Sequence, residues 1–147
     1  MNKKLISKYL LLFSFGSILY MIIEILFRGY TYYTMGITGG VAFILIGMIN
    51  EKLSSRNMYI ELQMLIGSII VTFIELVLGY LLLHVFNIRM WDYSDQLFNY
   101  KGYICPLFSF IWLFISLFAI LADDIIRYIG FDEDFPEYRS FFSKLSK

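Results

Sequence analysis

GSILYMIIE, residues 16–24, is an apolar stretch that ends on a carboxylate, and the same outline returns as GSIIVTFIE at residues 67–75. Both stretches lie within longer apolar segments, of the length that crosses a membrane as a helix. An ionisable side chain inside a bilayer costs about 2.5–3.5 kcal/mol on insertion scales, so it faces protein or water. The two stretches therefore predict membrane helices that each have one polar side.

The composition agrees with a membrane protein. Hydrophobic residues make up 59% of the 147-residue chain and charged residues 16%, against roughly a quarter charged in soluble domains. The net charge is zero and the basic residues are scattered, so nucleic acid is not an expected partner. One cysteine, Cys105, excludes an intrachain disulfide and a cysteine-rich metal site, and we expect neither metal nor cofactor.

Four apolar stretches have the length of membrane spans, at about residues 5–27, 33–49, 62–86 and 103–122. The first continues too far to be a removable signal peptide. We therefore expect a single integral membrane domain over residues 1–147, all-α in fold. Residues 123–147 are expected to form a cytoplasmic tail, which either lies along the membrane interface or is solvated.

The lysines and arginines predict how the chain is oriented, because cytoplasmic segments retain positive charge. Three fall on one side, namely Arg28, Arg89 and Lys101. Nine fall on the other, namely Lys3, Lys4, Lys8, Lys52, Arg56, Arg127, Arg139, Lys144 and Lys147. Both termini are thus predicted to be cytoplasmic, with the loop between the third and fourth spans outside.

The recurring stretch predicts an internal repeat. Gly16 and Glu24 have the same spacing as Gly67 and Glu75, and Ser17 matches Ser68. Because the first and third spans cross in the same direction, these matches indicate two helix hairpins in a parallel arrangement. Chance similarity between membrane helices is the alternative.

Each repeated stretch also predicts a polar seam along its helix. Ser17 and Glu24 are nearly eclipsed at about 100° per residue, as are Ser68 and Glu75. On one interpretation the two glutamates line a shared cavity that binds a cation, protons or a polar ligand. On the other, each is neutral or paired and only joins helices, Glu24 with Arg28 one turn on.

The remaining two spans carry one-sided patterns as well. Glycines share one face of the second span, which favours close helix packing over a helix thinned to admit a ligand; they are Gly36, Gly40 and Gly47, with Asn50 on the same line. The fourth span aligns Ser109, Trp112, Ser116 and Asp123. Trp112 then either packs in the core or walls a cavity. His84 lies off the Glu75 seam and is expected to be packed or interfacial.

The segment WDYSDQLFNYKGYICPLFSFIWLF, residues 91–114, resembles the signature of a family of small bacterial membrane proteins labelled putative ABC-transporter type IV, or CmpB-like. The matching residues are Trp91, Asp92, Tyr93, Asn99, Gly102, Phe108, Ser109 and Trp112. The resemblance implies four spans, the cytoplasmic membrane of a bacterium and a permease-like role. Asp92, Tyr93, Asn99 and Trp112 join Ser17, Ser68 and the two glutamates as candidate ligand-binding residues.

Two classes of function remain open. One is a permease-like transporter or transporter subunit that uses Glu24 and Glu75; the chain has no Walker-type loop, so ATP-driven transport would need a separate ATPase subunit. Four spans enclose little space, which favours a homo-oligomer or a membrane-protein partner. The other class is a non-transporting scaffold, assembly factor or lipid-binding protein. An enzyme is not expected, since no nucleophile and histidine stand at useful spacing.

Overall fold

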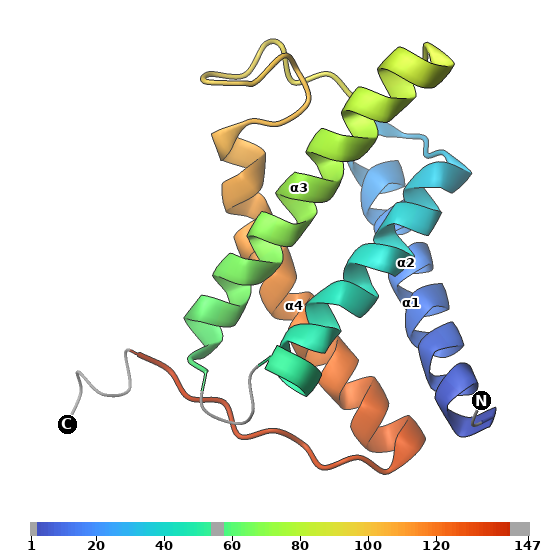
Figure 1. Ribbon diagram of the computed structural model, residues 1–147, viewed down its shortest axis with the longest axis vertical. Helices are drawn as coiled ribbons and strands as arrows, with labels where there is room; N and C mark the ends of the chain where they lie inside the picture. Colours follow the sequence, from blue (N-terminus) through green and yellow to red (C-terminus); the bar gives the residue numbers. More distant parts are fainter. Residues whose placement is uncertain (1–2, 54–57, 142–147) are drawn as a thin grey trace.

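The computed structural model describes residues 3–53 and 58–141, which form four long helices and no β-strand. The helices are α1 (Lys3–Arg28), α2 (Tyr33–Met48), α3 (Ile60–Phe86) and α4 (Pro106–Phe131), with a short π-helix η1 (Ile49–Leu53) directly after α2 (Figure 1). Apolar residues fill all four, because a helix satisfies its own backbone hydrogen bonds. The all-helical fold predicted from the sequence is confirmed.

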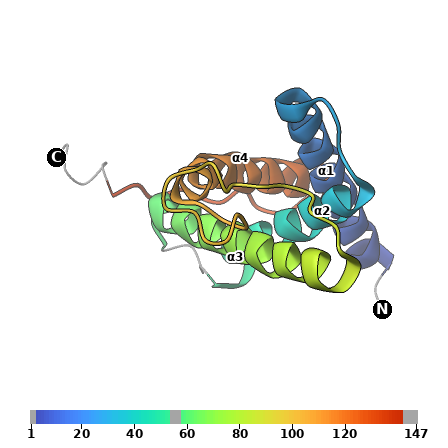
Figure 2. The same cartoon turned by 90° about the horizontal axis from the view of Figure 1, so that it is seen from above.

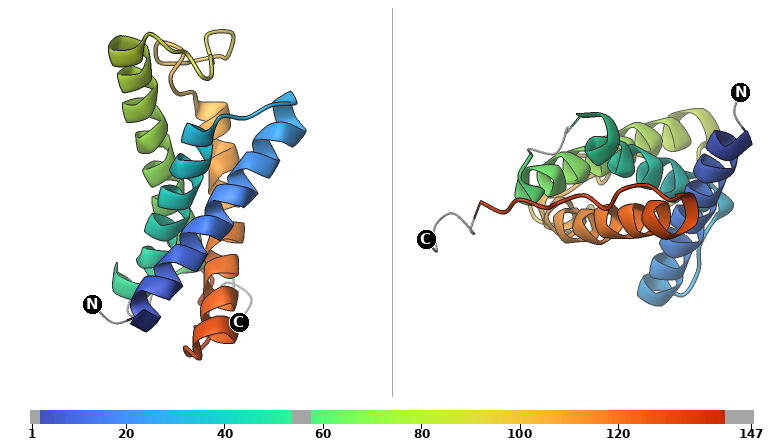
Figure 3. Two further views of the ribbon diagram at one scale, coloured as in Figure 1. Left: turned by 90° about the vertical axis from the view of Figure 1, so that its right-hand side faces the viewer. Right: turned by 90° about the horizontal axis from the view of Figure 1, so that it is seen from below.

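The helices run alternately up and down (Figure 1). We call the end that carries the α3–α4 loop the loop end, and the end that carries both termini the terminal end. From above, the α3–α4 loop lies across the helix ends (Figure 2). Helix α2 contacts each of the other three helices, whereas α1 leans away from α3 at the loop end (Figure 3).

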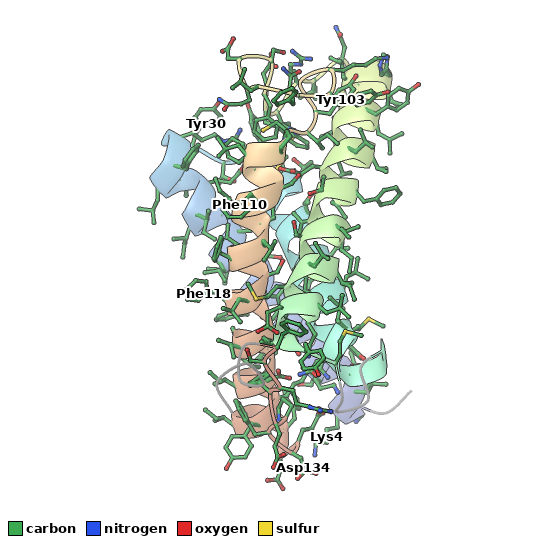
Figure 4. All side chains as sticks on the ribbon, turned by 90° about the vertical axis from the view of Figure 1, so that its left-hand side faces the viewer. Lys4, Tyr30, Tyr103, Phe110, Phe118 and Asp134 are labelled. Carbon is green, nitrogen blue, oxygen red and sulfur yellow. The ribbon has the colours of Figure 1, made fainter. Side chains whose placement is uncertain are left out.

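Each of the four helices is long and apolar enough to cross a membrane. Large apolar side chains cover their outer faces; Phe110 and Phe118, for example, project outward from α4 and are 59% and 68% exposed (Figure 4). Such a surface is stable against lipid and not against water. The chain is therefore a multi-pass membrane protein. Of the charges used to predict its orientation, Arg56, Lys144, Lys147 and the side chain of Lys52 lie outside the described residues.

The fourth helix differs most from the predicted span of residues 103–122. It begins at Pro106, because proline lacks an N–H to donate and is suited to the first helical turn. It continues to Phe131, so the first nine residues expected in the tail are helical. Charged side chains in this last part are buried among partners from other segments, which sequence hydropathy does not register. The other three helices begin and end within about two residues of the predicted spans.

Glycines let the first two helices approach closely. A Cβ atom at Gly16 would overlap Phe43, and one at Gly39 would overlap Tyr20. Gly40 packs against Ser17 in the same contact. Small residues in such positions give membrane helices their close contacts. Of the two interpretations of the second span, close packing is confirmed.

Candidate functional site

Glu75 is a buried carboxylate in the loop-end half of α3, with only 4% of its surface exposed. One oxygen, Oε2, accepts a hydrogen bond of 2.9 Å from the indole N–H of Trp112 on α4. The other, Oε1, accepts one of 2.9 Å from the hydroxyl of Tyr93 in the α3–α4 loop. Within the described residues neither oxygen has a basic partner, so the carboxylate is held by two neutral donors.

Tyr93 reaches Glu75 because the α3–α4 loop folds down onto the bundle. Its ring stacks on Phe108 at the start of α4, with centroids 4.4 Å apart. Nearby, the Trp91 indole donates to the carbonyl of Tyr103 at 2.8 Å, and both rings pack over Gly79 of α3. Burial, and next the Glu75 carboxylate, raise the pKa of the Tyr93 phenol above its ordinary value. The phenol therefore remains a hydrogen-bond donor at physiological pH.

Asp92 and Asn99 give the loop its shape. Asp92 accepts hydrogen bonds from the backbone N–H of Ser94 at 2.9 Å and from the Ser94 hydroxyl, and it pairs with Arg89. The Ser94 hydrogen bonds lower the pKa of the Asp92 carboxyl below its ordinary value. Asn99 accepts from the N–H of Gly102 at 3.0 Å, where φ is 73° and glycine is favoured. Both side chains bond within the loop, so they position Tyr93 without contacting Glu75.

Glu24 has different partners. Its two oxygens accept from the Arg28 guanidinium at 2.7 Å and from the Thr31 hydroxyl at 2.8 Å. Arg28 also donates to the carbonyl of Met90 at 2.6 Å, which ties the end of α1 to the α3–α4 loop. Pairing of Glu24 with Arg28, the second interpretation of this residue, is thus observed.

Glu24 and Glu75 both lie in the loop-end halves of their helices but do not bond to each other within the described residues. Tyr20 of α1 packs beside the Glu75 site, since its ring stacks on Trp112 with centroids 5.9 Å apart. The two predicted seams therefore have different partners, since Ser17 packs on α2 and Glu24 bonds to Arg28 and Thr31. Ser68 and Glu75 bond instead to α4 and the α3–α4 loop.

The serines of the two seams show this separation. Ser68 donates to the carbonyl of Ser109 on α4 at 2.5 Å. The Ser17 hydroxyl is buried against Gly40 of α2 with no hydrogen-bond partner in the described structure. The two serines therefore do not belong to one pocket. His84 is exposed near the end of α3, with its Nε2 atom 3.2 Å from the Tyr103 hydroxyl and its ring 4.4 Å from that of Tyr80.

Sequence reasoning missed a cluster of charges at the terminal end. Lys8 of α1, which is 6% exposed, lies 2.8 Å from Glu133 and 3.3 Å from Glu51. Arg127 of α4 lies 2.9 Å from Glu51 and 2.6 Å from Asp123. The alignment of Asp123 with Trp112 and Ser116 was the one signal in the sequence. These ion pairs join α1, η1 and α4 at the terminal end, where α1 and α4 otherwise have few contacts.

Comparison with known proteins gives one match. A model of the family described as putative ABC-transporter type IV matches residues 2–129, which cover the four helices apart from the last two residues of α4. No curated protein and no solved structure matches the chain. Since the match spans most of the chain, including the loop that carries Tyr93 and the helix that carries Trp112, the protein belongs to this putative ABC-transporter type IV family.

Proposed function

We propose that the chain is a permease-like transporter or transporter subunit in which Glu75 is the central polar group of a gated site. The observation that carries this is the Glu75 carboxylate, buried between two membrane helices and closed off by a residue of a loop. Ionisable groups within membrane spans commonly mark paths for ions, protons or substrates. The family description points to the same class of function.

The α3–α4 loop is the gate in this proposal. Tyr93 is the loop side chain that contacts Glu75, so its departure would leave Oε1 open to a cation, a proton or a polar ligand. Glu24 acts at a second attachment, because it holds Arg28 on the carbonyl of Met90. The two glutamates would then act together on one loop, Glu75 directly and Glu24 through Arg28.

The surroundings of this site follow from the sequence. The distribution of lysine and arginine favours an orientation with both termini and the terminal end in the cytoplasm and the loop end outside, and the family resemblance favours the cytoplasmic membrane of a bacterium. The duplicated stretches favour two hairpins related as a parallel repeat. A bundle of four helices has little interior, so a second copy or another membrane protein would complete the pathway, and ATP-driven transport would require a separate ATPase subunit.

Proton or cation flux in liposomes tests the proposal. The purified chain is reconstituted with a pH-sensitive dye inside, and flux is driven by a potassium diffusion potential. We expect Glu75→Gln to abolish the dye response and Tyr93→Phe to increase it, because the first removes the ionisable group and the second weakens the gate. Asp95→Asn removes an exposed carboxylate from the same loop and is the matched control. Equal flux for wild type, Glu75→Gln and Asp95→Asn would overturn the proposal.

A non-transporting scaffold is the second candidate. It is favoured by the pairing of all four oxygens of Glu24 and Glu75 with donors of the chain itself, as in a site that only joins helices. A stoichiometric membrane partner that co-purifies with the wild type and is lost on Trp91→Ala, together with absent flux, would support this role. Flux that depends on Glu75 would exclude it.

A further inference from the structure

A pocket of about 630 Å³ opens at the terminal end, opposite the Glu75 site. It lies between η1, the start of α3, the end of α4 and the segment of residues 132–141, which crosses beneath the bundle toward the start of α3 (Figure 1). That segment is held in place: the Tyr138 hydroxyl donates to Asp124 at 2.5 Å, and the N–H of Ile60 donates to the carbonyl of Arg139 at 2.8 Å. The pocket has the size of a small-molecule site.

The lining of this pocket is strongly acidic. Five carboxylates contribute to it, namely Glu51, Asp124, Glu133, Asp134 and Glu137. Two basic side chains oppose them, Arg127 in the lining and Lys8 of α1, which pairs with Glu51 and Glu133. The Arg127 guanidinium already lies within 4 Å of carboxylates on three residues, so it offers little to an anion. The charge balance therefore favours a cation.

Gln63 of α3 supplies the second observation. Its side chain lines the pocket and is 3% exposed. The amide nitrogen donates to the carbonyl of Met58 at 3.3 Å, but the amide oxygen has no hydrogen-bond partner within the described residues. A buried acceptor without a donor is costly, so it commonly marks a place that a ligand or water completes. Here the missing group is a donor.

We propose that this pocket binds a primary ammonium group, with Gln63 and the surrounding carboxylates as acceptors. A metal ion fits less well, because within the described residues no three histidine, cysteine, aspartate or glutamate side chains come together as ligands. An ammonium group has three N–H donors, which the amide oxygen and neighbouring carboxylates accept. The group belongs either to a soluble diamine or to an ethanolamine headgroup, and this assignment does not depend on the role of Glu75.

Titration calorimetry on the full chain in phosphatidylcholine nanodiscs tests the assignment, with 1,4-diaminobutane as the probe and uncharged 1,4-butanediol as its control. We expect the diamine to bind and the diol not to. Gln63→Leu should weaken binding about tenfold, since a hydrogen bond to a charged group is lost. Glu137→Gln, an exposed position, should weaken it about two- to fivefold. Asp132→Asn removes the same charge beside the pocket and should leave the Kd unchanged.

Nanodiscs that contain phosphatidylethanolamine distinguish the two sources of the ammonium group. Loss of diamine binding in these discs assigns the pocket to the lipid headgroup, whereas unchanged binding assigns it to a soluble amine. No diamine binding in phosphatidylcholine discs would overturn the proposal. An equal effect of Asp132→Asn and Glu137→Gln would also overturn it, because attraction would then come from general surface charge.

Discussion

Replacing Tyr93 by phenylalanine should loosen the α3–α4 loop without unfolding the bundle. The change removes the hydroxyl that donates to Glu75 at 2.9 Å and keeps the ring that stacks on Phe108. An intramolecular hydrogen bond of this kind contributes about 0.5–1.5 kcal/mol net. At tenfold for each 1.4 kcal/mol, the loop should open about 2 to 10 times more often.

Hydrogen–deuterium exchange in nanodiscs measures this opening. The amide of Tyr93 donates to the carbonyl of Gly102 at 3.0 Å, and the amide of Tyr100 donates to that of Ile104 at 2.9 Å, so both report on the closed loop. We expect both amides to exchange faster in Tyr93→Phe by that factor, whereas amides in the middle of α3 keep their protection.

Tyr100→Phe is the matched control, because Tyr100 belongs to the same loop but is 55% exposed. The amides of the Tyr100→Phe variant should exchange at the same rates as those of the wild type. In a Glu75→Gln background, Tyr93→Phe should have a smaller effect than in the wild type, since the carboxyl acceptor of the Tyr93 hydroxyl is gone. Equal exchange in Tyr93→Phe, Tyr100→Phe and wild type would refute the assignment of Tyr93 as the residue that closes the loop.

Two further perturbations address packing and pH. In Gly47→Ala the new Cβ would overlap the Asp123 carboxylate, so we expect thermal unfolding to show a loss of about 1–3 kcal/mol of stability. Gly130→Ala is the control: no atom lies near the new Cβ, so this variant should be neutral or slightly stabilising. The pKa of Asp92 is lowered in the folded protein because Ser94 donates hydrogen bonds to its carboxylate. Asp92 therefore stabilises the loop fully above its unfolded pKa of about 3.9, and this stabilisation is lost as the pH falls through its folded pKa. The amide NMR shift of Ser94 should follow this titration in the wild type and not in Asp92→Asn; a pH-independent shift in the wild type would contradict it.

The sequence by itself determined the helices and the faces that carry polar groups. Each helix depends on a continuous apolar run and its own backbone hydrogen bonds, which are local properties. The proline at the start of α4 and the serine seven residues before each glutamate are also local features, so they can be recognised in the sequence. The seam from Ser68 to Glu75 faces α4, and the line from Ser109 to Asp123 faces α3 and α2.

Only the tertiary structure decided which groups these faces meet. Which helices pair decides that Tyr93 contacts Glu75, and it also separates the Ser17 seam from the Ser68 seam. Two similar seams in a sequence do not indicate which helices pair. The length of α4 was missed for a related reason. In the sequence, charged residues such as Arg127 suggest a solvated tail. In the fold they are buried, because Glu51 and Lys8, which are distant in the sequence, pack beside them. Burial of a charge depends on its partners in space, and the crossing of the helices sets those partners.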